Sequence, residues 1–212
     1  MESTLRIPLG TKLIETFGWV PGQGYPRLDR HLRRLAHSAA ILGFRCDIPA
    51  IRAALATYES DMQMRCRLTL ACDGRMEVTR SPMSPRKPFW MIQIGPQRLH
   101  AADPWLRHKT TNRALYDDAR AALPAGVDEL IFLNERDELC EGTITNIFVK
   151  TQTGEMLTPP LSSGCLPGVY RQEQLDSGAC REAVLRLADL EAAHWIGVGN
   201  ALRGAICAKF QP

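Results

Sequence analysis

The chain has 212 residues, of which 45% are hydrophobic and 23% are charged. This composition is typical of one large globular domain or two small ones, and it excludes an intrinsically disordered chain. The formal net charge of +3, from 26 basic and 23 acidic residues, is too small to favour nucleic-acid binding on charge alone.

The first half of the chain predicts a small N-terminal α+β domain at 1–97. Alternating and β-rich segments predict strands, and apolar residues at helical spacing predict helices. The expected elements are a strand at 13–20, helices at 30–43 and 47–58, hairpin strands at 64–71 and 76–80, and a strand at 89–94. Gly43 is a helix stop signal, and Asp73-Gly74 is a turn signal that joins hairpin strands.

We expect a linker at 98–104 and a larger C-terminal domain at 105–212, which would carry Lys109. The elements expected there are a helix at 111–123, strands at 129–133, 139–149 and 156–158, a glycine- and proline-rich loop at 162–168, a helix from 169 and a strand at 195–198. Strands and helices in both halves, with hairpin connections, predict an α+β chain of two lobes.

The sequence indicates a cytoplasmic protein without a membrane partner. Residues 1–15 lack the apolar segment of a signal peptide, and no apolar run approaches the about 20 residues of a membrane helix. Seven cysteines without a C-x-x-C pair fit buried thiols in a reducing compartment better than a disulfide framework. The five histidines show no metal-ligand spacing, so we expect no metal site.

Lysine is scarce, which narrows the search for a nucleophilic amine. Only positions 12, 87, 109, 150 and 209 are lysine, and arginine stays charged at any working pH. Lys109 precedes the helix expected from 111, whose positive dipole end would favour the uncharged, nucleophilic amine. On position alone, the alternative of an ordinary solvated charge is preferred.

Glu141 lies in a stretch, 139–149, that otherwise contains apolar residues, threonines and one asparagine. A buried carboxylate needs a partner, either a neighbouring arginine or a protonated heterocyclic nitrogen such as a pyridinium. The loop 161–170 runs into a helix, and backbone N–H groups at such a junction can bind phosphate, although many ordinary loops share the pattern. Arg34, on the helix at 30–43, is by itself typical of a surface charge.

Five motifs follow one another along the chain. They are Arg-His-Leu-Arg-Arg-Leu at 30–35, His-Lys-x-x-Asn at 108–112, Glu-Gly-Thr-x-x-Asn-x-Phe at 141–148, Leu-Pro-Gly-Val-Tyr-Arg at 166–171 and Gly-Asn-Ala-Leu at 199–202. In this order they resemble the class IV aminotransferases, the fold-type IV enzymes that use pyridoxal 5′-phosphate (PLP). The resemblance implies a two-lobed α+β fold like that of D-amino-acid aminotransferase, PLP in the cleft between the lobes, and a homodimer.

Carried over position by position, the resemblance implies a role for each matching residue. Lys109 would form the Schiff base with PLP and move protons at the substrate carbon, while Glu141 would keep the pyridine nitrogen protonated. Arg34 would bind the phosphate, and Leu166 would pack on the ring face. The other residues implied around the cofactor are Thr143, Thr145, Gly168, Val169, Tyr170, Asn200 and Ala201.

The same cofactor site serves branched-chain and D-amino-acid aminotransferases and aminodeoxychorismate lyases. Arg113 replaces the tyrosine typical of branched-chain enzymes at this place, and Asn200-Ala201-Leu202 is similar to the lyase pattern. We therefore predict a 4-amino-4-deoxychorismate lyase, which eliminates pyruvate to give 4-aminobenzoate, a folate precursor. The alternatives are an amino-acid aminotransferase that uses a 2-oxo acid and a catalytically degenerate PLP-binding dimer.

The partner implied is a small-molecule amine or amino acid whose carboxylates would be met by arginine. The residues predicted to bind it are Thr16, Arg67, Arg107 and Arg203.

Overall fold

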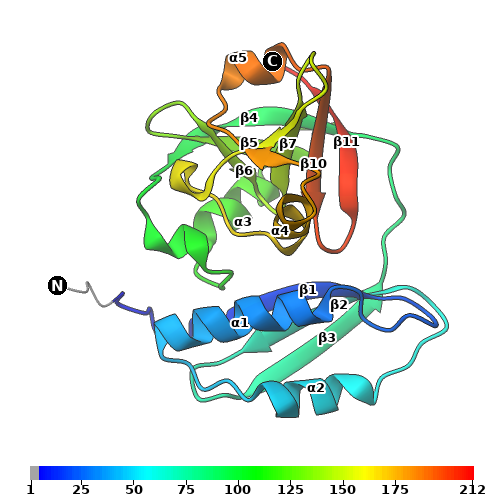
Figure 1. Cartoon of the computed structure of the whole chain (residues 1–212). Helices are drawn as coiled ribbons and strands as arrows, with labels where there is room; N and C mark the ends of the chain where they lie inside the picture. Colours follow the sequence, from blue (N-terminus) through cyan, green and yellow to red (C-terminus); the bar gives the residue numbers. More distant parts are fainter. Residues whose placement is uncertain (1–4) are drawn as a thin grey trace. The chain divides into compact units, whose positions relative to one another are not determined.

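A computed structural model describes residues 5–212, and the contacts divide the chain into two units (Figure 1). The first unit runs to Pro85 and includes His108–Asn112, and the second contains Arg86–Arg107 and Arg113–Pro212. The sequence placed the division at 98–104 and Lys109 in the C-terminal domain. The contacts differ because β4 (Trp90–Leu99) pairs within the second unit, whereas Thr110 forms a bridge to Leu13 of the first.

The first unit is an antiparallel sheet with two helices. Its elements in chain order are β1 (Leu13–Trp19), α1 (Leu28–Leu42), α2 (Ile48–Ala56), β2 (Met64–Leu70) and β3 (Met76–Pro82), and the strand order is β1-β2-β3. The expected helix stop at Gly43 is confirmed, since it has a left-handed φ of 68° at the end of α1. The expected turn between β2 and β3 is confirmed at Gly74, with a φ of 89°.

The two faces of this sheet differ in what covers them. Cys66, Leu68 and Leu70 of β2 are buried, as their alternation predicts. Phe17 of β1 is on the same face, because it is the register partner of Cys66, and its ring lies 5.4 Å from that of His31 on α1. Helix α1 therefore covers this face, and Figure 1 shows it running along β1.

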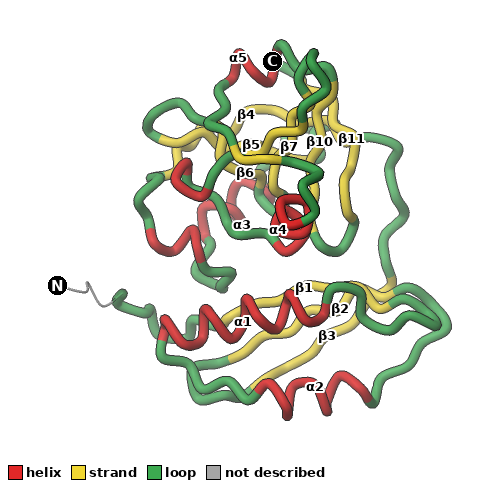
Figure 2. Tube along the Cα trace, in the orientation of Figure 1, coloured by secondary structure: helices red, strands yellow, loops and turns green. Residues whose placement is uncertain are grey.

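The second unit contains a closed ring of strands. The elements after β4 are α3 (Ala114–Ala121), β5 (Glu129–Asn134), β6 (Leu139–Gly142), β7 (Asn146–Lys150), β8 (Met156–Thr158), α4 (Val169–Asp176), β9 (Arg181–Glu182), α5 (Leu187–Glu191), β10 (Trp195–Asn200) and β11 (Gly204–Phe210), with short 3₁₀ turns at Pro104–Arg107 and Leu161–Ser163. The sheet order is β10-β11-β4-β5-β6-β7-β8-β9, and β10 also pairs with β7. This extra pairing closes the strands from β10 to β7 around an apolar core (Figures 1 and 2).

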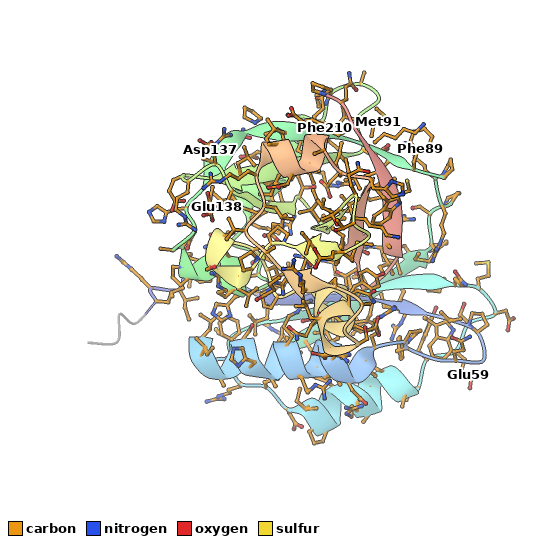
Figure 3. The ribbon with its side chains drawn as sticks, turned by 45° about the horizontal axis from the view of Figure 1, so that its top comes forward. Glu59, Phe89, Met91, Asp137, Glu138 and Phe210 are labelled. Carbon is orange, nitrogen blue, oxygen red and sulfur yellow. The ribbon has the colours of Figure 1, made fainter. Side chains whose placement is uncertain are left out.

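Three elements differ from the sequence predictions for physical reasons. The expected strand 139–149 is two strands, because Thr143 and Ile144 donate their N–H groups to the side chain of Glu129 instead of to a neighbouring strand. The expected helix from 111 begins only at Ala114. β11, which was not predicted, pairs in parallel with β4, and Figure 3 shows Phe89, Met91 and Phe210 where these strands meet. No helix among the described residues is long and apolar enough to cross a membrane.

Candidate active site

The backbone of Lys109 is fixed against the first strand of the first unit. Ile14 donates its N–H to the carbonyl of Lys109 at 2.8 Å, and Thr111 donates its N–H to the carbonyl of Lys12 at 2.9 Å. On the preceding residue, Nδ1 of His108 lies 3.0 Å from Oγ of Ser38 on α1. The expected placement of Lys109 directly before a helix was wrong, because α3 begins five residues later, too far for its dipole to act on the amine. Pairing with β1 holds this segment instead.

Arg34 is part of a buried charge cluster on the face of the sheet that α1 covers. Its Nε and Nη2 atoms donate to the two oxygens of Glu15 at 2.9 and 2.7 Å, and Nδ1 of His31 lies 2.6 Å from the same carboxylate. The side chains are 11%, 1% and 0% exposed, respectively, for Arg34, Glu15 and His31. Arg34 is therefore not the solvated surface charge that its helix position alone would favour.

The pKa values of Glu15 and His31 depend on two opposing effects, burial and the charged neighbours. Burial acts to raise the pKa of Glu15, but the charge of Arg34 and the hydrogen bond from His31 lower it to about 2. Burial lowers the pKa of His31, and Glu15 opposes that shift. Glu15 is thus ionised and forms a bidentate ion pair with Arg34, which fixes the orientation of the guanidinium group.

Thr16 and Arg67 lie together on the other face of the same sheet. They are register partners in the β1–β2 pair, so their side chains project on the same side. Glu15 and Phe17 flank Thr16 in β1 and project toward α1, which puts Thr16 and Arg67 opposite the Arg34 cluster. Both side chains are half-buried.

In the second unit, Glu141 is buried on β6, with 6% of its surface exposed. Its Oε1 accepts a hydrogen bond from the phenol of Tyr116 on α3 at 2.7 Å, and its Oε2 accepts one from the N–H of Leu166 at 3.0 Å. Burial and the adjacent Glu141 raise the pKa of Tyr116, so the phenol keeps its proton and acts as a donor. Glu141 is consequently held as an acceptor by two donors from distant segments.

Three of the motifs predicted for the cofactor converge in this unit. Asn146 on β7 donates through Nδ2 to the carbonyl of Leu166 at 3.1 Å, so Leu166 is held at both its N–H and its carbonyl. Asn200 donates through Nδ2 to the carbonyl of Ile144 at 3.3 Å. The turn at 143–145, the loop at 165–168 and the end of β10 are therefore neighbours.

Two glycines allow these segments to approach. A Cβ on Gly168 would overlap Oδ1 of Asn146, and a Cβ on Gly199 would lie 3.0 Å from the ring of Tyr170. Helix α4 starts directly after Gly168, at Val169, and no side chain among the described residues caps it. Tyr170 packs edge-on against Phe148 with ring centroids 5.7 Å apart, which ties the start of α4 to β7.

Arg107 and Arg203 lie near the same segments. Arg107 donates through Nη1 to the carbonyl of Cys165 at 3.0 Å. Arg203 follows Ala201 in the turn between β10 and β11 and lines a cavity of about 180 Å³ with Arg86, Lys87 and Trp90. Burial, and then the charges of Arg86 and Arg120, lower the pKa of Arg203, which indicates a positive local potential suited to an anion.

Sequence reasoning missed two residues that hold this site. Tyr116 lies seven positions after Lys109 on the predicted amphipathic helix, and only the structure brings its phenol to Glu141. Glu129 opens β5 and is fully buried, with four hydrogen bonds from the turn at 143–145. An acid within the apolar stretch Glu129–Asn134 was the available signal, because a buried charge requires partners.

The residues present fit PLP. Its aldehyde needs an amine, its phosphate needs a cation with N–H donors, and its pyridine nitrogen needs a carboxylate. The first unit contains an amine and a cation, Lys109 and Arg34, and the second unit contains a buried carboxylate, Glu141, and a helix start without a side-chain cap at α4.

Comparison with known proteins gives the family. A family model described as amino-transferase class IV matches residues 12–209. The aminodeoxychorismate lyase of Saccharomyces cerevisiae (strain ATCC 204508 / S288c) is 27% identical over 135 residues, which cover 55% of this chain and 36% of that protein. The chain thus matches about a third of the length of this relative.

Solved structures share the fold. A protein from Mesorhizobium loti, provisionally assigned as an amino-acid aminotransferase, is 43% identical with a TM-score of 0.90, and the match covers 95% of this chain and 100% of that one. A provisionally assigned 4-amino-4-deoxychorismate lyase from Legionella pneumophila is 22% identical with a TM-score of 0.74, covering 94% and 82%. A hypothetical aminotransferase from Mycobacterium tuberculosis in its PLP-bound form is 23% identical with a TM-score of 0.80, covering 94% and 81%. The predicted α+β, fold-type IV architecture is confirmed, and the chain belongs to the class IV aminotransferase family of PLP-dependent enzymes.

Proposed function

We propose that this enzyme is a 4-amino-4-deoxychorismate lyase that releases pyruvate and 4-aminobenzoate. The observation that carries the proposal is the turn that follows β10. Oδ1 of Asn200 accepts the N–H groups of Leu202 and Arg203 at 3.2 and 3.0 Å, while its Nδ2 donates to Ile144. A threonine has one hydroxyl and a shorter side chain, so it could not make all three of these hydrogen bonds. The Asn-Ala-Leu sequence, which resembles the lyase pattern, therefore supports the proposal.

Two further observations support the lyase. Arg113, which stands where branched-chain enzymes typically carry tyrosine, donates through Nη2 to the carbonyl of Thr143 at 2.8 Å and through Nε to Asp117. This position is therefore occupied by a fixed cation instead of a phenol. The similarity to the aminodeoxychorismate lyase of S. cerevisiae points the same way.

In this proposal, Lys109 is the catalytic residue. When bound, PLP supplies an electron sink that acidifies the substrate carbon bearing the amino group. The amine of Lys109 would take the proton from that carbon, and the ring C–O bond to the enolpyruvyl group would break as the ring becomes aromatic. The released enolpyruvate would take up one proton to become pyruvate, which leaves 4-aminobenzoate. Glu141 would hold the proton on the ring nitrogen of the cofactor, and Leu166 would pack on the ring.

The phosphate is assigned to Arg34 together with the backbone N–H groups of Val169 and Tyr170 and the turn at Asn200 and Ala201. Gly168, predicted from the resemblance to contribute its backbone as well, donates its N–H to the carbonyl of Leu166 at 2.8 Å. Glu15 contributes by fixing the guanidinium of Arg34. Thr143 and Thr145 line the cofactor, and the substrate carboxylates are assigned to Arg67, Arg107 and Arg203 with Thr16 beside Arg67. A homodimer, which light scattering at micromolar concentration would detect, completes the proposal.

Replacing Arg34 by alanine is expected to raise the dissociation constant of PLP by roughly 10- to 100-fold, because a charged hydrogen bond contributes about 1.5–3 kcal/mol. The measurement is a spectroscopic titration of the apoprotein with PLP. Arg33→Ala is the matched control, since Arg33 is the exposed neighbour on α1. An unchanged constant in Arg34→Ala would place the phosphate elsewhere.

A direct product assay tests the reaction. The PLP-loaded enzyme is incubated with 4-amino-4-deoxychorismate, and we expect 4-aminobenzoate and pyruvate in equal amounts. The second candidate, an amino-acid aminotransferase, is favoured by the 43% identity to the M. loti protein. Glutamate formed from amino acids and 2-oxoglutarate, without 4-aminobenzoate, would establish that candidate and reject the lyase. If neither product forms, the remaining candidate is the catalytically degenerate PLP-binding dimer.

A further inference from the structure

Glu129 is a buried carboxylate of the second unit that accepts several hydrogen bonds and has no assigned role. It is 0% exposed at the start of β5. Its Oε1 accepts the N–H of Thr143 at 3.0 Å and the Thr143 hydroxyl, and its Oε2 accepts the N–H of Ile144 at 3.2 Å and the Thr145 hydroxyl at 3.0 Å. Two backbone N–H groups and two hydroxyl groups of the turn at 143–145 therefore donate to this one side chain.

The shape of the turn depends on this contact. Gly142 donates its N–H to the carbonyl of Thr145 at 2.7 Å, which closes the turn around the carboxylate. A Cβ on Gly142 would lie 2.8 Å from Cδ of Glu129, so a larger residue there would displace the carboxylate. Arg120 completes the surroundings, with Nη1 at 3.7 Å from Glu129 and 3.1 Å from Oγ1 of Thr143.

The turn at 143–145 also fixes the positions of two residues that hold the loop at 165–168. Glu141 and Asn146 are register partners on either side of the turn. Glu141 accepts the N–H of Leu166, and Asn146 donates to its carbonyl, so both contacts depend on the spacing of the pair. A looser turn would change that spacing and move the carboxylate of Glu141.

We propose that Glu129 is a positioning residue that acts through the turn at 143–145 on Glu141 and Asn146, and so on the binding of PLP. The inference rests on the proposed role of Glu141 at the ring nitrogen. It also assigns the polarity of the turn: each threonine hydroxyl donates its single proton to Glu129, so Thr143 and Thr145 present only acceptor lone pairs to a ligand. These hydroxyls would thus suit a donor group and would not bind the phosphate.

Burial raises the pKa of Glu129, and the hydroxyl of Thr143, the charge of Arg120 and the N–H of Ile144 oppose that shift. The number of donors around the carboxyl group indicates why it is retained. The two backbone N–H groups and the two hydroxyls would be left buried without an acceptor if Glu129 were replaced by an apolar residue. A glutamine offers one acceptor oxygen, and its NH₂ group would face two of these donors. Glu129→Gln therefore removes the acceptor of two of the four hydrogen bonds from the turn while keeping the volume of the side chain.

The test compares PLP affinity with stability in the full-length chain. Glu129→Gln is expected to raise the PLP dissociation constant by about 10-fold or more, from the loss of charged hydrogen bonds, and to shift the visible absorption maximum of the bound cofactor. Asp128→Asn is the matched control, because Asp128 precedes it in sequence and accepts the N–H of Met91 away from the turn. This control is expected to keep both the dissociation constant and the absorption maximum.

Ile131→Val separates positioning from stability. Ile131 is buried on the same strand and pairs with Gly142, and this change destabilises by about 0.5–1.5 kcal/mol without removing any hydrogen-bond donor or acceptor of the turn. If Glu129→Gln binds PLP as wild type does, or loses affinity only as much as an equally destabilised Ile131→Val, the positioning role is overturned. Should Glu129→Gln fail to fold, Glu129→Asp, which keeps the charge but shortens the reach, is measured against the same limits. Failure of the wild type to bind PLP would overturn the proposed function and this inference with it.

Discussion

Replacing Lys109 by arginine is expected to reduce turnover by at least about 10³-fold, the scale of a lost general base and nucleophile. Arginine keeps the positive charge but cannot give up its proton at working pH, so it can neither join the cofactor aldehyde nor take a proton from the substrate. The backbone of this segment is held by Ile14 and Lys12, and the substitution leaves those bonds intact. The measurement is the steady-state rate with the substrate that the product assay identifies.

Lys150→Arg is the matched control for this variant. Lys150 ends β7 and is half-buried, as Lys109 is, yet it has no role in the proposal. Borohydride treatment of the PLP-loaded wild type, followed by peptide mapping, is expected to place the mass of the cofactor on Lys109. Label on a different lysine, or full activity in Lys109→Arg, would remove Lys109 from the chemistry.

The strands of the fold could be predicted where burial alternates, and less well where side chains replace backbone pairing. β2 was predicted within a residue because Cys66, Leu68 and Leu70 are buried on one face. The break between β6 and β7 was not, because it depends on hydrogen bonds from Thr143 and Ile144 to a side chain 14 and 15 residues earlier. A contact between residues so far apart in the sequence cannot be predicted from the local pattern of residues.

The candidate site shows the same division between local and long-range information. The motifs that contain Glu141, Leu166 and Asn200 were identified by their resemblance to a family, and the second unit brings them together. The residues that support them were missed, since Tyr116 reaches Glu141 from 25 positions away. For Arg34, the sequence offered a surface charge or a phosphate ligand, and only the structure shows the buried Glu15 that fixes its direction.

Replacing Glu141 by glutamine is expected to leave PLP bound at saturating cofactor concentration while lowering turnover by about 10²–10³-fold, the scale of a lost electrostatic partner. The neutral amide cannot hold a proton on the ring nitrogen, so the cofactor would lose much of its capacity as an electron sink. In addition, Tyr116 and the N–H of Leu166 both donate to Glu141, and a glutamine can accept from only one of them through its oxygen. Tyr116→Phe, which removes one donor, is expected to cost less than Glu141→Gln.

Glu138→Gln is the control that makes this comparison specific. Glu138 lies three residues earlier, next to the turn at Asp137 (Figure 3), and the hydrogen bond from Arg136 lowers its pKa to about 2. Removing its charge is expected to lower the free energy of unfolding, because Arg136, Asn134 and Ser163 lose a charged acceptor. Turnover per bound PLP should stay within about twofold, since the side chain has no contact with Glu141 in the described hydrogen-bond network. If turnover per bound PLP fell as much in Glu138→Gln as in Glu141→Gln, both residues would act through stability. The assignment of Glu141 to the ring nitrogen would then be rejected.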